Sequence, residues 1–102
     1  MFQFKTIRRV TVYADATLES ALLPRFLALG ARGYTVTDCR GKGEHETVQN
    51  PFSSVHNRVR IELLVLPEQA EKILAFLQTG QFKNQAVTSC MDTVQIAASE
   101  HF

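Results

Sequence analysis

The sequence predicts an α+β fold in which two helices cover one face of a four-stranded antiparallel sheet. Segments rich in β-branched and aromatic residues and segments with helical apolar spacing follow one another as strand, helix, strand, strand, helix, strand. Each helix has an apolar stripe, which one face of the sheet can bury. The chain has 102 residues, 45% of them hydrophobic and 21% charged, as expected for a single globular domain with one core.

The first strand is predicted over residues 4–13, which are rich in Val, Ile, Thr, Phe and Tyr. Asp15 or Thr17 is expected to cap the helix that follows, because a short polar side chain can accept from free backbone amides. Gly30 and Gly33 mark the end of this helix, since glycine enters left-handed conformations without a Cβ clash. The apolar residues that share one face of the helix are Leu18, Leu22, Phe26 and Leu29.

The second strand is predicted over residues 34–39 and the third over residues 58–66. Apolar side chains alternate along the third strand and define its buried face: Val59, Ile61, Leu63 and Val65. Between the two strands, residues 41–57 contain Gly, Asn, Pro and Ser and show no sustained period. A loop of this length within a compact domain is usually functional or disordered.

The second helix is predicted to begin at Pro67, which suits the first helical position, and to end at Gly80. Its apolar stripe consists of Ala70, Ile73, Leu74 and Leu77. A last strand is predicted over residues 86–97. The resulting order, βαββαβ, is that of the ferredoxin-like fold. Because this fold places its second and fourth strands at opposite edges of the sheet, we expect Cys39 and Cys90 to lie too far apart for an intrachain disulfide.

Composition argues against several classes of function. Eleven Lys and Arg against ten Asp and Glu give a net charge of +1, so no electrostatic attraction to nucleic acid or anionic membrane is expected. No apolar run approaches the roughly 20 residues needed to cross a bilayer, and the first residues lack the pattern of a signal peptide. We therefore expect a cytoplasmic protein. Ser53 and Ser54 have no convincing His or Asp partner, and no HExxH motif occurs, so we do not expect an enzyme.

Several motifs resemble those of the PII signal-transduction superfamily, over roughly residues 5–97. Residues 33–38 read Gly-Tyr-Thr-Val-Thr-Asp and lead into Gly-Lys-Gly at residues 41–43. Residues 58–62 read Arg-Val-Arg-Ile-Glu, and Thr79 and Gly80 follow the second helix. The resemblance implies a PII-like homotrimer with adenine nucleotides in the clefts between subunits. It also implies a flexible T-loop, at about residues 42–57, that engages or releases a protein partner.

The same resemblance identifies candidate nucleotide-binding residues. Those implied on and after the second strand are Thr35, Gly41, Lys42 and Gly43, and those on the third strand are Arg58, Arg60 and Glu62. Lys83 is the one cation of the segment after the second helix that could reach a phosphate. Taken alone, Gly41-Lys42-Gly43 fits a plain turn better than a phosphate-binding loop. Arg58 and Arg60 fit contact with an anion or acidic partner and, equally well, a solvated face or intersubunit ion pairs.

The chain departs from ordinary PII proteins where the polyphosphate would be held. Residues 81–86, Gln-Phe-Lys-Asn-Gln-Ala, replace a glycine- and lysine-rich loop, and Gln95-Ile96-Ala97 replaces an Arg-x-Arg pair. Each missing cation removes a charge-assisted contact of about 1.5–3 kcal/mol. We therefore expect AMP or ADP rather than ATP. The motifs are most similar to PII-like proteins linked to bicarbonate transport and carboxysomes, which implies bicarbonate as a second ligand and a partner such as a bicarbonate transporter.

Two alternative functions remain open from the sequence. Glu44, His45, Glu46 and His56 combine carboxylates and imidazoles, which suit zinc or copper, so a metal-responsive PII-like protein for metal tolerance or efflux is one alternative. Their spacing matches no compact ligand motif, and no resident metal or cofactor is expected. A ferredoxin-like interaction module that binds no nucleotide is the other alternative.

Overall fold

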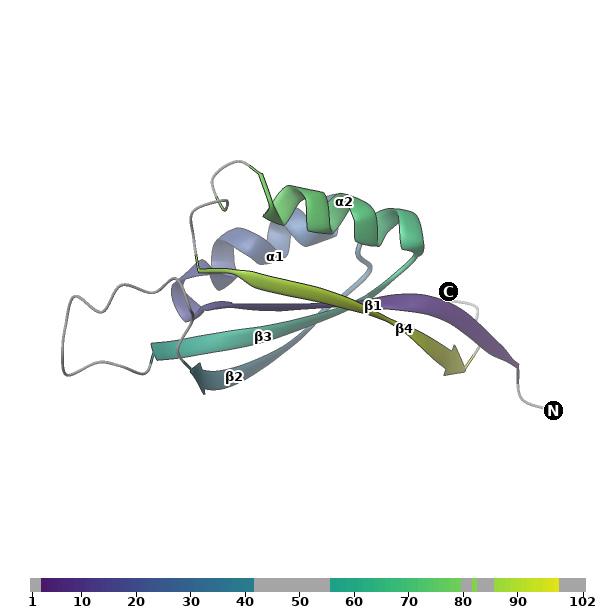
Figure 1. The fold of residues 1–102 in the computed structure, drawn as a ribbon, viewed down its shortest axis with the longest axis horizontal. Helices are drawn as coiled ribbons and strands as arrows, with labels where there is room; N and C mark the ends of the chain where they lie inside the picture. The colour runs from purple at the N-terminus through teal and green to yellow at the C-terminus, as the bar shows by residue number, and fades with distance from the viewer. Residues whose placement is uncertain (1–2, 42–55, 80–81, 83–85, 98–102) are drawn as a thin grey trace.

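The computed structural model describes residues 3–41, 56–79, 82 and 86–97, and its elements follow the predicted order (Figure 1). They are β1 (Phe4–Asp15), the 3₁₀ turn η1 (Ala16–Leu18), α1 (Glu19–Ala28), β2 (Thr35–Gly41), β3 (His56–Val65), α2 (Pro67–Leu77) and β4 (Thr88–Ala97). None of the described helices has the length and apolar character needed to cross a membrane.

The four strands form one antiparallel sheet in the order β2-β3-β1-β4. This order confirms the ferredoxin-like prediction and places β2 and β4 at the two edges. Cys39 on β2 and Cys90 on β4 are both free thiols at opposite edges, as expected. The β1–β3 pairing begins at Arg8, so residues 4–7 of β1 pair with β4 alone and extend the sheet as two strands.

The core lies between the sheet and the two helices, which cover the same face (Figure 1). The predicted alternation of β3 is confirmed, because Val59, Ile61, Leu63 and Val65 are all buried. The other strand and helix residues that complete the core are Val10, Val12, Ala14, Leu22, Phe26, Ala70, Ile73 and Leu77. Strand side chains alternate, so the intervening residues of each strand lie on the opposite face, which no helix of the described residues covers. We call it the open face.

The helix ends follow the expected capping chemistry. Asp15 caps the first turn, because its Oδ1 accepts from the Thr17 backbone N–H at 2.9 Å. Gly30, with φ at 110°, ends α1, and the next N–H, of Ala31, donates to Phe26 O at 3.1 Å. At the start of α2, Gln69 Oε1 accepts from the Leu66 N–H at 2.9 Å, which satisfies a donor that the helix leaves unpaired.

Strand ends differ slightly from the prediction. The second strand continues to Gly41, and the third begins at His56, inside the predicted T-loop of residues 42–57. Both extensions come from continued pairing of β2 with β3, ending at Gly41 opposite His56. Residues 42–55 and the predicted helix end at Gly80 lie outside the described residues.

Candidate functional site

Two of the predicted site residues lie side by side where β2 begins. Thr35, the first residue of β2, is directly opposite Glu62 of β3 in the sheet register. Opposite residues of an antiparallel pair project to the same face, here the open face. Together they line a hollow of about 250 Å³. The full lining is Arg32, Gly33, Tyr34, Thr35, Glu62 and Leu64. We call this the first hollow.

The first hollow combines apolar surface with a few polar groups. Tyr34 and Leu64 are large apolar residues that remain 47% and 39% exposed. The Glu62 carboxylate accepts hydrogen bonds, and the Thr35 hydroxyl both donates and accepts. An apolar surface with a few fixed polar groups is typical of small-molecule sites and suits a flat ring with hydrogen-bonding edges.

Arg60 lies on the open face beside this hollow but does not line it. It is two residues before Glu62 on β3 and opposite Thr37 and Tyr13 on the neighbouring strands. Its Nε lies 3.3 Å from Glu62 Oε1, close enough for ionic attraction. The pair is not aligned as a hydrogen bond, and the buried Nε finds no acceptor among the described residues. Arg60 therefore partly neutralises the charge of the Glu62 carboxylate, but its Nε–H does not donate a hydrogen bond to that carboxylate.

Arg58 and Gly41 lie at the opposite end of β2 and β3. Arg58 is only 7% exposed, and its Nη2 donates to Ala86 O at 3.4 Å. Gly41 is six residues along β2 from Thr35, a separation of roughly 20 Å at about 3.3 Å per residue. Within one protomer, the Thr35–Glu62 pair and the Gly41 end therefore do not converge on one small ligand. Lys42, Gly43 and Lys83, the other predicted site residues, lie outside the described residues.

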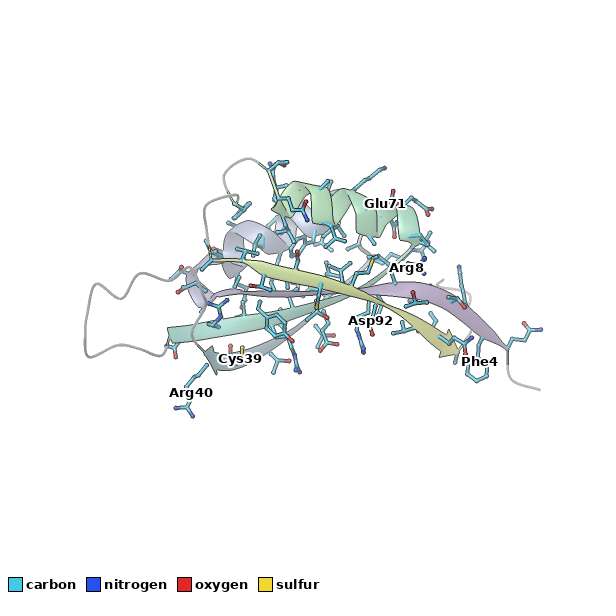
Figure 2. The ribbon with its side chains drawn as sticks, in the orientation of Figure 1. Phe4, Arg8, Cys39, Arg40, Glu71 and Asp92 are labelled. Carbon is cyan, nitrogen blue, oxygen red and sulfur yellow. The ribbon has the colours of Figure 1, made fainter. Side chains whose placement is uncertain are left out.

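Elsewhere on the open face, an ion pair joins the neighbouring strands β1 and β4. Arg9 of β1 binds Asp92 of β4 through two contacts, Nε to Oδ1 at 3.1 Å and Nη2 to Oδ2 at 2.6 Å. Hydrogen bonding by Arg9 lowers the pKa of Asp92, and Asp92 in turn raises the pKa of Arg9. Figure 2 shows Cys39 and Asp92 on the side of the sheet away from the helices.

Sequence reasoning did not assign four residues of the first hollow to the site: Arg32, Gly33, Tyr34 and Leu64. Leu64 could have been found from strand alternation, because it is an apolar residue on the same face as Arg60 and Glu62. Tyr34 adjoins the Gly33–Thr35 motif. Arg32 lies between α1 and β2, where no periodic pattern indicates the direction of a side chain.

Of the metal candidates, Glu44, His45 and Glu46 lie outside the described residues. Within the part of the chain that the structure does describe, no three His, Cys, Asp or Glu side chains gather as metal ligands would.

The chain is similar to a PII-like signalling protein from Thermus thermophilus, with 30% identity, a TM-score of 0.76, and coverage of 93% of this chain and 92% of that chain. It is also similar to CPII, a nitrogen regulatory PII-like protein from Thiomonas intermedia. The CPII structure bound to ADP, AMP and bicarbonate gives 15% identity, a TM-score of 0.79, and coverage of 95% and 99%. The structure bound to ADP and bicarbonate gives 15% identity, a TM-score of 0.79, and coverage of 96% and 95%.

A comparison with curated proteins found no match. The model of the family described as nitrogen regulatory protein P-II matches residues 7–100, which include all four strands almost completely and both helices. With a match over nearly the whole sequence, and a PII-like relative at 30% identity, the chain belongs to the P-II family.

Proposed function

We propose that this protein is a regulatory sensor that binds AMP or ADP in clefts between the subunits of a homotrimer. The observation that carries the proposal is the first hollow, where Thr35 and Glu62 meet beside the apolar surfaces of Tyr34 and Leu64. Such a site suits the flat base of a nucleotide, whose edge carries donors and acceptors.

The separation along β2 supports a site shared between subunits. Gly41, which begins the segment proposed to approach the phosphates, is roughly 20 Å from Thr35 in the same protomer. A nucleotide that contacts both must therefore take the two ends from different copies. Arg58, Arg60 and Lys83 would contribute positive charge along the cleft.

Nucleotides with one or two phosphate groups match the few cations that the chain offers near the proposed site. The segments at residues 81–86 and 95–97 contain a single cation, Lys83, where ordinary PII proteins carry several. The structures of CPII bound to ADP, AMP and bicarbonate support the same ligands here, with bicarbonate as a second ligand. We place the protein in the subgroup linked to carboxysomes and bicarbonate transport, acting in the cytoplasm as a regulator rather than an enzyme.

The proposed output is a change in the T-loop, at about residues 42–57. Ligand binding orders this segment and thereby exposes or hides a surface for a protein partner in inorganic carbon uptake or fixation. The ligand can do so only through its different affinities for the two states of the loop. Lys42→Ala is expected to weaken nucleotide binding by removing a cation next to the phosphates.

Calorimetric titration of AMP, ADP and ATP, each with and without bicarbonate, tests the proposal. We expect micromolar binding of AMP or ADP that bicarbonate strengthens, and by linkage the nucleotide must strengthen bicarbonate binding by the same factor. Thr35→Val keeps a β-branched side chain but removes the hydroxyl, so it should weaken AMP binding. Thr37→Val, on the same face but outside the first hollow, is the matched control.

The proposal fails if no nucleotide produces heat, or if the two threonine variants bind AMP equally well. Sedimentation should give a particle of three times the 11.5 kDa chain mass. If zinc or copper raised the melting temperature while nucleotides did not, the metal-responsive alternative would replace the proposal. If neither kind of ligand raised the melting temperature, the ferredoxin-like interaction module would replace the proposal.

A further inference from the structure

Gly33 occupies a position where nothing in the described fold requires glycine. Its φ is not positive, unlike that of Gly30, so a residue with a side chain could adopt the same backbone conformation. A Cβ built at Gly33 meets no atom within 4 Å, so packing does not exclude a side chain either. Yet Gly33 belongs to the lining of the first hollow. The space that its side chain would occupy is therefore empty, at a residue that borders the hollow.

The residues around this empty space suit a ring better than a phosphate group. Tyr34 and Leu64 line the same hollow and keep large apolar surfaces exposed. Glu62 contributes a carboxylate, which repels a phosphate and accepts hydrogen bonds from amino or hydroxyl groups. Arg32, the cation of the lining, already has an interaction partner in the folded chain. The lining therefore favours the uncharged base of a nucleotide over its phosphates.

A planar ring gains most from a surface that it can approach closely. Glycine permits close approach to the backbone because no Cβ is in the way, and an aromatic side chain adds stacking. We propose that Gly33 and Tyr34 form the contact surface for the nucleobase in the first hollow, Gly33 by leaving room beside the backbone and Tyr34 by stacking against the base. Gly33 is then a specificity-determining residue. This inference rests on the proposed function, since it takes the nucleotide as the ligand.

Calorimetric titration of AMP into Gly33→Ala tests the part assigned to Gly33. Because its surroundings are open, this variant should lower neither the urea midpoint nor the particle mass in sedimentation. AMP should nevertheless bind about tenfold more weakly, as expected for an extra methyl group in a packed contact. Gly33→Val should weaken AMP binding further. Ala97→Val adds two methyl groups at an exposed strand position outside the first hollow and should bind AMP like the unmodified protein.

Tyrosine fluorescence tests the part assigned to Tyr34, because the chain has two tyrosines and no tryptophan. Tyr13 lies outside the first hollow, so Tyr13→Phe leaves Tyr34 as the emitting side chain. In that background, saturating AMP should quench the emission as the base stacks on the phenol ring. Tyr34→Leu keeps an apolar side chain without the aromatic ring and should weaken AMP binding about tenfold. Tyr34→Phe, which keeps the ring, should restore most of that loss.

The inference and the proposed function can fail separately. If AMP binds the unmodified protein, equal AMP affinity in Gly33→Ala and Ala97→Val would overturn the inference and leave the proposed function in place. Tyr34 emission that AMP does not change would do the same. A lower urea midpoint or a smaller particle for Gly33→Ala would also overturn it, because the fold would then need the glycine. If no nucleotide gives heat with the unmodified protein, the proposed function fails and this inference fails with it.

Discussion

Gly30 should tolerate substitution poorly, because two features of its surroundings require glycine. Its φ of 110° lies in a region that L-residues rarely adopt. A Cβ at this position would also approach Gln69 Nε2 to 2.9 Å, closer than real Cβ contacts allow. Gln69 would have to move, although its Oε1 caps the Leu66 N–H at the start of α2. The predicted effect of Gly30→Ala is therefore a loss of stability transmitted to the second helix.

The magnitude follows from three contributions. Left-handed backbone in a residue with a Cβ costs about 1–2 kcal/mol. Displacing Gln69 from its hydrogen bond costs about 0.5–1.5 kcal/mol. Alanine also restricts the unfolded chain, which returns about 0.4–1 kcal/mol. The free energy of unfolding should fall by about 1–3 kcal/mol, which moves a urea midpoint by about 1–2 M at an m-value of about 1.5 kcal/mol per molar.

Urea denaturation at a fixed protein concentration measures this difference, since assembly makes stability depend on concentration. Gly33→Ala is the matched control, because Gly33 has no positive φ and nothing lies within 4 Å of a Cβ built there. In a Gln69→Ala background, Gly30→Ala should lower the free energy of unfolding by the backbone contribution alone. Equal midpoints for the two alanine variants would refute the reasoning.

Three other predictions concern the core, the open face and the T-loop. Ile61→Ala, at a fully buried position, should lower the free energy of unfolding by about 2–5 kcal/mol in the same denaturation assay. Hydrogen bonding by Arg9 lowers the pKa of Asp92 below its ordinary value of 3.8. The ionised pair therefore stabilises the fold above that pH, the contribution disappears as pH falls through the folded-state pKa, and Asp92→Asn should flatten the acid limb of a stability–pH curve. Under the proposed function, deleting residues 46–55 should leave the particle mass in sedimentation equal to that of a trimer while abolishing binding to the proposed protein partner.

Much of the fold was predictable because its signals are local. The alternation of Val59, Ile61, Leu63 and Val65 identifies both a strand and its buried face without knowledge of the neighbouring strands. Pro67 and the helical spacing after it likewise identify the start and inner face of α2. Strand ends were less predictable. The extension of β3 back to His56 depends on pairing with Gly41, which is a contact between strands rather than a property of either segment.

The candidate site was only partly predictable, because contacts between separate segments decide which of its residues meet. Sequence motifs indicated Thr35 and Glu62, and their adjacency then required the register of β2 with β3. Arg32 depends on the direction of a connecting segment, and no pattern in the sequence indicates a binding role for it.

The geometry of β2 also links ligand binding to assembly. Under the proposed function, a nucleotide contacts the Thr35 end of one protomer and the Gly41 end of another, because these ends lie roughly 20 Å apart within one chain. Each bound nucleotide then stabilises the trimer by mass action and binds poorly to a dissociated subunit. Dilution or a dissociating variant should therefore weaken nucleotide binding, because a dissociated subunit offers only one end of the site.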